Sequence, residues 1–160
     1  MAMPATTNFS SSFAALQDRR GPQWLEAIRS NAMERFSELG FPTFRQEEWK
    51  YTKVDFTHKI AFDLAPPGHN GLNKDHLEQL IFGNLQCPQM VFVDGHYSEN
   101  LSSLQELSAH IHVQSLSEAL LQNPEQLEPH LARLADYQDH AFVALNTAFI
   151  QDGAFIRISG

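Results

Sequence analysis

Residues 40–52 read Gly-Phe-Pro-Thr-Phe-Arg-Gln-Glu-Glu-Trp-Lys-Tyr-Thr. Two phenylalanines, a tryptophan and a tyrosine crowd around a proline and several charges, and neither a helical nor a strand period explains this spacing. Large aromatic side chains are costly to leave in water, so we expect these four to pack. The stretch contains no recognisable catalytic apparatus. It is therefore predicted to be a fixed junction that locks helices to a sheet.

A helix is predicted immediately before this junction, from about residue 22 to residue 39. Pro22 suits its first turn, and Gly40 followed by Pro42 ends it. Its apolar stripe is Leu25, Ile28, Ala32, Phe36 and Leu39. A shorter helix is expected over residues 8–20, with Phe9, Phe13 and Leu16 at helical spacing.

Several shorter elements are expected after the junction. Residues 89–97 give the strongest strand signal, and Asp94-Gly95 predicts a hairpin turn within them because glycine readily takes a positive φ. The other expected elements are an extended segment or short strand (51–64), a short helix capped by Asn73 and running to Phe82, a strand (110–114), a helix capped by Ser115 or Ser117, a helical start between Pro124 and Pro129, a buried helix (142–150) and a strand (154–158). The last strand either pairs backwards or belongs to a longer sheet, and we favour the longer sheet.

Composition places the chain among ordinary globular proteins. It has 160 residues, 42% apolar residues and a formal charge of −8. Residues 1–74 carry nine Lys and Arg against eight Asp and Glu, a net of +1, whereas residues 75–152 carry one Arg against eleven acidic residues, a net of −10. An acidic half of this kind disfavours nucleic-acid binding, and its simplest interpretation is a solvated surface. No apolar run is long enough to span a bilayer and no secretion signal is indicated, so we expect a cytoplasmic protein that contacts neither nucleic acid nor membrane.

Two blocks of sequence together resemble the SufB/SufD family of the SUF iron–sulfur cluster assembly system, and its SufD branch in particular. The first is Phe-Pro-Thr through Glu-Trp-Lys-Tyr-Thr at residues 41–52, and the second is Phe-Val-Ala-Leu-Asn-Thr-Ala-Phe at 142–149 with Asp-Gly-Ala-Phe-Ile-Arg-Ile at 152–158. The resemblance spans about residues 24–158. It departs from the family in length, because members run to several hundred residues.

The resemblance implies the fold and the partners. We expect an α+β fold, with N-terminal helices packed on a small antiparallel sheet and ending in the first strand of a parallel β-helix. The expected segments are a flexible or helical lead-in (1–21), an N-terminal α+β domain (22–150) and a truncated β-helix strand (151–160). The implied partners are a SufB-like protein and a SufC-like ATPase, with a second SufD copy as a further option. The iron–sulfur cluster would be handled by the complex, with no cofactor bound by this segment.

Three residues are weak candidates for metal or cluster binding. Cys87 offers a soft thiolate, but a single cysteine cannot hold a cluster that normally takes four ligands. His110 and His112 stand two apart on a predicted strand and could face one side, yet a zinc site needs further ligands. We therefore assign no catalytic, cofactor or metal residue.

The competing hypotheses are a freestanding acidic protein-binding module and, less favoured, a small metal- or ligand-binding enzyme domain. Motifs for nucleophilic, phosphate-binding and zinc-hydrolase chemistry are absent from the sequence. Glu47 and Glu48 are adjacent, so we expect one to pair with Arg45 or Lys50 and the other to face water. The sequence therefore favours a non-catalytic scaffold or interaction element, not an enzyme.

Overall fold

The computed structural model describes residues 9–17, 21–54, 56–57, 60–68, 71–80, 87–104 and 107–159. Its fold is α+β, as the sequence predicts, and it divides into two compact units. Unit 1 comprises Met1–Leu64 and Asn123–Ile150, and unit 2 comprises Ala65–Gln122 and Gln151–Gly160. The chain thus enters each unit twice.

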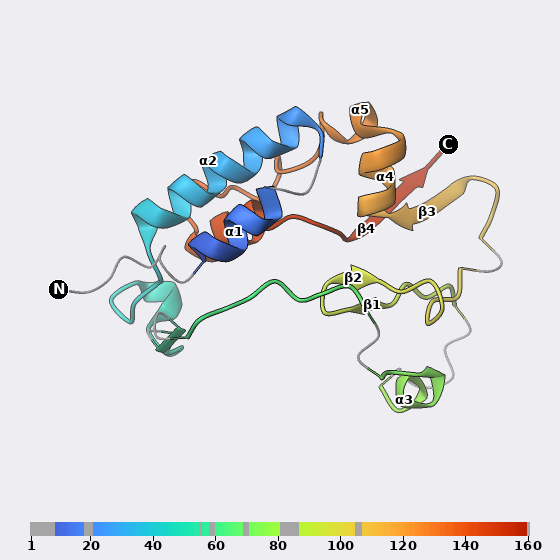
Figure 1. Ribbon diagram of the computed structural model, residues 1–160, viewed down its shortest axis with the longest axis horizontal. Helices are drawn as coiled ribbons and strands as arrows, with labels where there is room; N and C mark the ends of the chain where they lie inside the picture. Colours follow the sequence, from blue (N-terminus) through green and yellow to red (C-terminus); the bar gives the residue numbers. More distant parts are fainter. Residues whose placement is uncertain are drawn as a thin grey trace. The chain divides into compact units, whose positions relative to one another are not determined.

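Unit 1 contains the junction and the helices within and around it (Figure 1). They are α1 (Ser10–Gln17), α2 (Gln23–Leu39), the 3-10 helix η2 (Glu47–Trp49), α5 (Pro124–Leu127) and α6 (Ala141–Ala148). The predicted bounds of α2 are confirmed because both ends carry strong local signals. Gly40 ends the helix with φ 66° and ψ −175°, a conformation that side-chain-bearing residues rarely adopt.

The main partner of α2 is α6, another helix of the same unit. The expected packing of the N-terminal helices on a small sheet stays a prediction. Ala141, Ala144 and Ala148 are buried on α6, and small side chains let two helices approach closely. Phe36 of α2 is completely buried in the resulting core. Helical periodicity identifies an apolar face but does not say whether a helix or a sheet covers it.

Arg29 connects α2 to the residues that follow α6. Only 6% of this residue is exposed, and its Nε donates a hydrogen bond of 2.9 Å to the Ile150 carbonyl oxygen, with Nη2 donating to the same oxygen. A buried guanidinium is tolerated only when its donors are satisfied. The sequence analysis placed no weight on this arginine.

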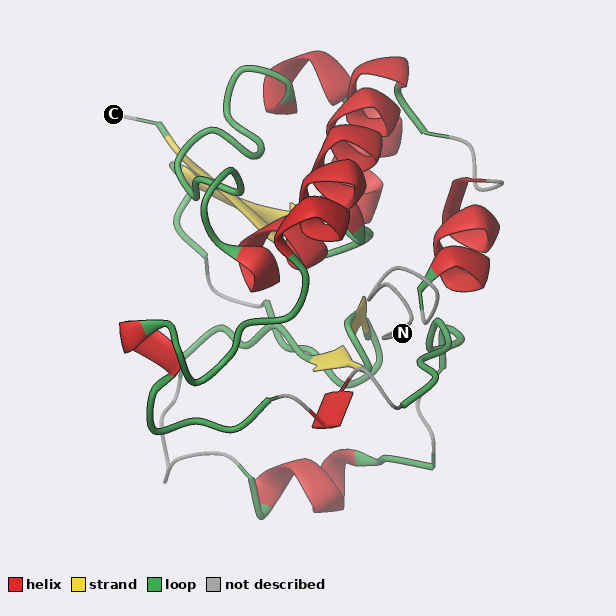
Figure 2. Ribbon diagram, turned by 90° about the vertical axis from the view of Figure 1, so that its left-hand side faces the viewer, coloured by secondary structure: helices red, strands yellow, loops and turns green. Residues whose placement is uncertain are grey.

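Unit 2 contains two antiparallel two-stranded sheets among its described residues, drawn in yellow in Figure 2. Its elements are α3 (Lys74–Glu78), β1 (Phe92–Val93), β2 (His96–Tyr97), β3 (Ile111–Ser115), α4 (Leu116–Gln122) and β4 (Ala154–Ile158). The hairpin of β1 and β2 confirms the predicted turn, with φ of 51° at Asp94 and 84° at Gly95. Asn73 caps α3 as predicted, but α3 ends at Glu78, and residue 82 lies outside the described residues.

The last strand, β4, pairs backwards. It lies antiparallel to β3 in a five-residue register from Ile111↔Ile158 to Ser115↔Ala154, and α4 packs against both strands (Figure 1). This is the option that the sequence analysis favoured less. The continuation of β4 into a parallel β-helix stays a prediction.

Candidate functional site

The junction of residues 40–52 borders a cavity of about 410 Å³ in unit 1. The end of α2, the helix η2 and the start of α6 form its wall, so it joins the two sequence blocks that carry the resemblance. Its lining includes Pro42, Glu47, Glu48, Trp49, His140 and Phe142. This cavity is the place where the junction could hold a ligand or a partner side chain.

Half of the junction aromatics pack inward, as predicted. The Phe41 ring meets the Phe36 ring edge-on with centroids 5.4 Å apart, and the Trp49 ring lies 5.1 Å from that of Phe142. Pro42 between them is buried. Trp49 is only half-buried, so it covers the helical core without entering it.

The other half of the junction aromatics point to solvent. Phe44 is 68% exposed and Tyr51 is 89% exposed. The prediction that all four rings pack is therefore wrong for these two. The hydrophobicity of Phe44 and Tyr51 predicted burial, but each ring is carried at the centre of a hydrogen-bonded turn.

The charged groups at the cavity form loose pairs. The Glu47 carboxylate lies 3.6 Å from Lys50 Nζ, which confirms the expected pairing, and Glu48 lies 3.7 Å from His140 Nδ1. All four side chains are at least half exposed, so these pairs contribute little to stability. None of them gives the hydrogen-bonded nucleophile and base that covalent catalysis requires.

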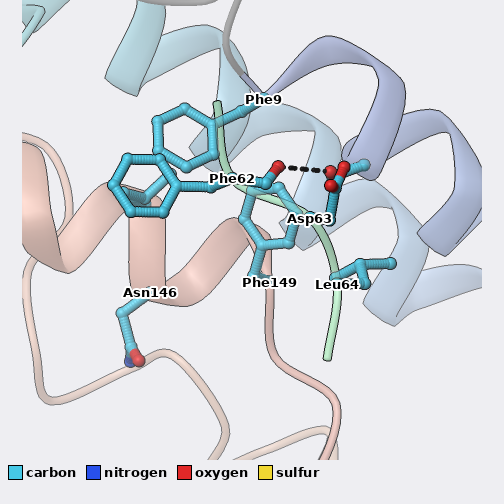
Figure 3. A pocket seen from close by; sticks show the side chains of 8 residues that line it. Phe9, Phe62, Asp63, Leu64, Asn146 and Phe149 are labelled. Carbon is cyan, nitrogen blue, oxygen red and sulfur yellow. Dashed lines mark hydrogen bonds between the residues drawn. The ribbon is translucent and has the colours of Figure 1, made fainter. Parts of the chain in front are cut away.

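A second cavity in unit 1, of about 330 Å³, is mostly apolar (Figure 3). The Phe9 and Phe62 rings stack with centroids 5.4 Å apart, and Phe149 lies next to them. Ser12 Oγ donates a 2.8 Å hydrogen bond to the Phe62 carbonyl oxygen, so this hydroxyl is engaged in holding the 60–64 segment on α1. The polar lining residues Asp63 and Asn146 add one carboxylate and one amide, a set too small to indicate a reaction.

The three metal candidates stay apart from any described cluster. Cys87 is exposed, His112 is exposed on β3, and His110 is exposed in the turn just before that strand. In the part of the chain that the structure describes, no three His, Cys, Asp or Glu side chains gather closely enough to hold a metal ion. Neither described cavity is lined by any of the three.

One structural site in unit 2 was missed by the sequence analysis. The Asp152 carboxylate accepts hydrogen bonds from three backbone N–H groups, those of Tyr97 (2.7 Å), Ser117 (3.0 Å) and Gly153 (2.8 Å). It thereby joins the β1–β2 hairpin, the first turn of α4 and the start of β4. The Asp-Gly pair at 152–153 predicted a turn, but nothing local could predict that a residue 55 positions away would donate to its side chain.

The fold is that of a helical unit and a small strand-containing unit with no assembled catalytic site among the described residues. The family model "SufBD protein N-terminal region" matches residues 6–160. The chain therefore belongs to the SufBD family, as the sequence blocks predicted, and corresponds to its N-terminal region.

Two curated relatives have the same family name. An iron–sulfur cluster assembly SufBD family protein of Synechocystis sp. is 28% identical over 130 residues, covering 81% of this chain and 28% of the relative. An Arabidopsis thaliana protein of the same description is 27% identical over 161 aligned residues, covering 88% of this chain and 33% of the relative. The chain thus spans about a third or less of the length of these relatives. Within the described residues, every helix is too short or too polar to cross a membrane.

Proposed function

We propose that the chain acts in iron–sulfur cluster assembly as the N-terminal region of a longer SufD-like subunit. The match of the family model over residues 6–160 is the observation that carries this proposal. The Synechocystis and Arabidopsis relatives, both named as iron–sulfur cluster assembly proteins, support the same role. In this proposal the subunit works in a SufB–SufC–SufD type complex in the cytoplasm, and a SufC-like partner hydrolyses ATP.

The role proposed for this region is scaffold and interaction, not chemistry. Cluster ligation by protein normally needs several thiolates, and the only cysteine of the chain is Cys87. Each described cavity lacks a paired nucleophile and base. A packed helical unit with exposed aromatic rings is instead suited to binding partner subunits.

A complementation experiment tests this proposal. A strain lacking the full-length gene would receive the full-length protein or a version without residues 1–140, and the activity and iron content of a cluster-containing enzyme would be measured. We expect the truncated version to leave cluster loading at the level of the deletion strain. Normal loading, with the truncated protein present at wild-type abundance, would overturn the proposal.

A further inference from the structure

Two hydrogen-bonded turns lie on the outer side of the junction. In the first, Gln46 N–H donates to the Thr43 carbonyl oxygen at 3.0 Å, which puts Phe44 and Arg45 at the turn centre. In the second, Thr52 N–H donates to the Trp49 carbonyl oxygen at 3.0 Å, which puts Lys50 and Tyr51 at the centre. Each turn therefore presents one aromatic ring and one cation. These four central residues are called the turn-tip set below.

The turn-tip set breaks the usual chemistry of turns. Central turn positions favour Gly, Pro, Asn, Asp and Ser, because these residues suit the turn backbone or hydrogen-bond to it. Here the rings of Phe44 and Tyr51 are 68% and 89% exposed although the backbone around them is hydrogen-bonded. Such a departure on an exposed, hydrogen-bonded segment is typical of a binding surface.

The junction carries both cations and carboxylates, and they differ in their surroundings. Glu47 and Glu48 line the junction cavity, whereas none of the turn-tip residues does. Among the described residues the Arg45 side chain makes no hydrogen bond or ion pair, whereas Lys50 Nζ lies 3.6 Å from the Glu47 carboxylate and 5.5 Å from the centre of the Tyr51 ring. The turn tips therefore combine two exposed rings with Arg45 and with Lys50, whose ion pair to Glu47 is exposed and weak.

We propose that the turn-tip set is a docking surface for an acidic segment of a partner protein. Aromatic residues and arginine are enriched at protein interfaces, and carboxylates would pair with Arg45 and Lys50 while an apolar side chain covers the rings. A phosphate polymer is a poorer fit, because two cations neutralise few phosphates and the chain has a net charge of −8. The inference goes beyond the cluster-assembly role and does not depend on it.

Photo-crosslinking tests the docking surface directly. The full-length protein would carry benzoylphenylalanine in place of Tyr51 in its native cells, with the same substitution at Leu134, which is 98% exposed in unit 1, as the control. We expect a product at position 51 whose linked peptide, identified by mass spectrometry, is rich in Asp and Glu. The double variant R45E/K50E should reduce this product at least about tenfold, because both attractive charges become repulsive.

The matched control variant is K74E/R133E, which makes the same charge change at two other exposed cations and should leave the product unchanged. If R45E/K50E does not keep the wild-type thermal unfolding midpoint, R45Q/K50Q replaces it. A product no stronger than at Leu134, a linked peptide without acidic residues, a product lost on nuclease or lipid extraction, or one equally reduced in K74E/R133E would each overturn the inference. Because the readout is the crosslink and not cluster loading, its failure is distinguishable from failure of the proposed function.

Discussion

Unit 1 is held together by aromatic and aliphatic packing, whereas the segments of unit 2 are joined by hydrogen bonds to one carboxylate. In unit 1, Phe36 is fully buried and its ring touches those of Phe9 and Phe41. In unit 2, Asp152 connects the β1–β2 hairpin with α4, and the largest buried side chains of these two segments are aliphatic, Val93 and Leu120, with no fully buried aromatic ring. Unit 1 should therefore be most sensitive to removal of a buried ring, and unit 2 to removal of the Asp152 carboxylate.

The largest effect is expected for Phe36→Ala. Removing a fully buried ring leaves a cavity in unit 1, and the free energy of unfolding should fall by about 3 to 5 kcal/mol. Urea unfolding followed by far-UV circular dichroism measures this loss. Phe44→Ala is the matched control because it removes the same type of side chain at a position that is 68% exposed. A comparable loss in that variant would contradict the assignment of the core.

Next comes Asp152→Ala in unit 2. Three backbone N–H groups lose a charged acceptor, so we expect a loss of about 2 to 3 kcal/mol. Hydrogen exchange should accelerate at the Tyr97 and Ser117 amides and stay unchanged in α2. Asp63→Asn, an exposed carboxylate of unit 1, serves as the control. Unchanged exchange at Tyr97 and Ser117 would show that the carboxylate does not hold unit 2 together.

Gly40→Ala tests the backbone of the junction. A Cβ at this position meets nothing within 4 Å, so the expected cost of about 2 kcal/mol comes from the φ of 66° alone. Gly68→Ala is the control, because its Cβ is equally free of contacts and its backbone needs no positive φ. Equal thermal unfolding midpoints for the two variants would refute the strain at Gly40.

The smallest effect is expected for Trp49→Ala. A buried tryptophan would cost about 3 to 5 kcal/mol, but Trp49 is half-buried and its described ring contact is with Phe142, so we expect about 1 to 2 kcal/mol. Chemical unfolding of Trp49→Ala beside Trp49→Phe measures the loss and separates ring contact from size. A loss of unfolding free energy as large as that of Phe36→Ala would show that Trp49 belongs to the buried core.

Local signals predicted the elements well and their partners poorly. Pro22 and Gly40 fixed α2, Asp94-Gly95 fixed the hairpin, and Ser115 is confirmed as a cap of α4 because its Oγ accepts from the Glu118 N–H. These signals act within a few residues.

The partners depend on contacts that local patterns do not encode. The packing of α2 on α6 and the hydrogen bonds from the Tyr97 and Ser117 N–H groups to Asp152 join residues far apart in the chain. The exposure of Phe44 and Tyr51 contradicts their hydrophobicity, and only the turn geometry reveals it. The same limit applies to the site: the sequence identified the junction and the family, but not the outward half of the junction.

In the proposed function this region supplies a binding surface for cluster assembly and no cluster ligands. The most direct measurement replaces all three metal candidates in the full-length protein, as Cys87→Ser, His110→Ala and His112→Ala together, and compares cluster loading of a target enzyme with that of the wild type. The account predicts unchanged loading, since these exposed side chains form no described cluster. Loss of loading with an unchanged unfolding midpoint would contradict it.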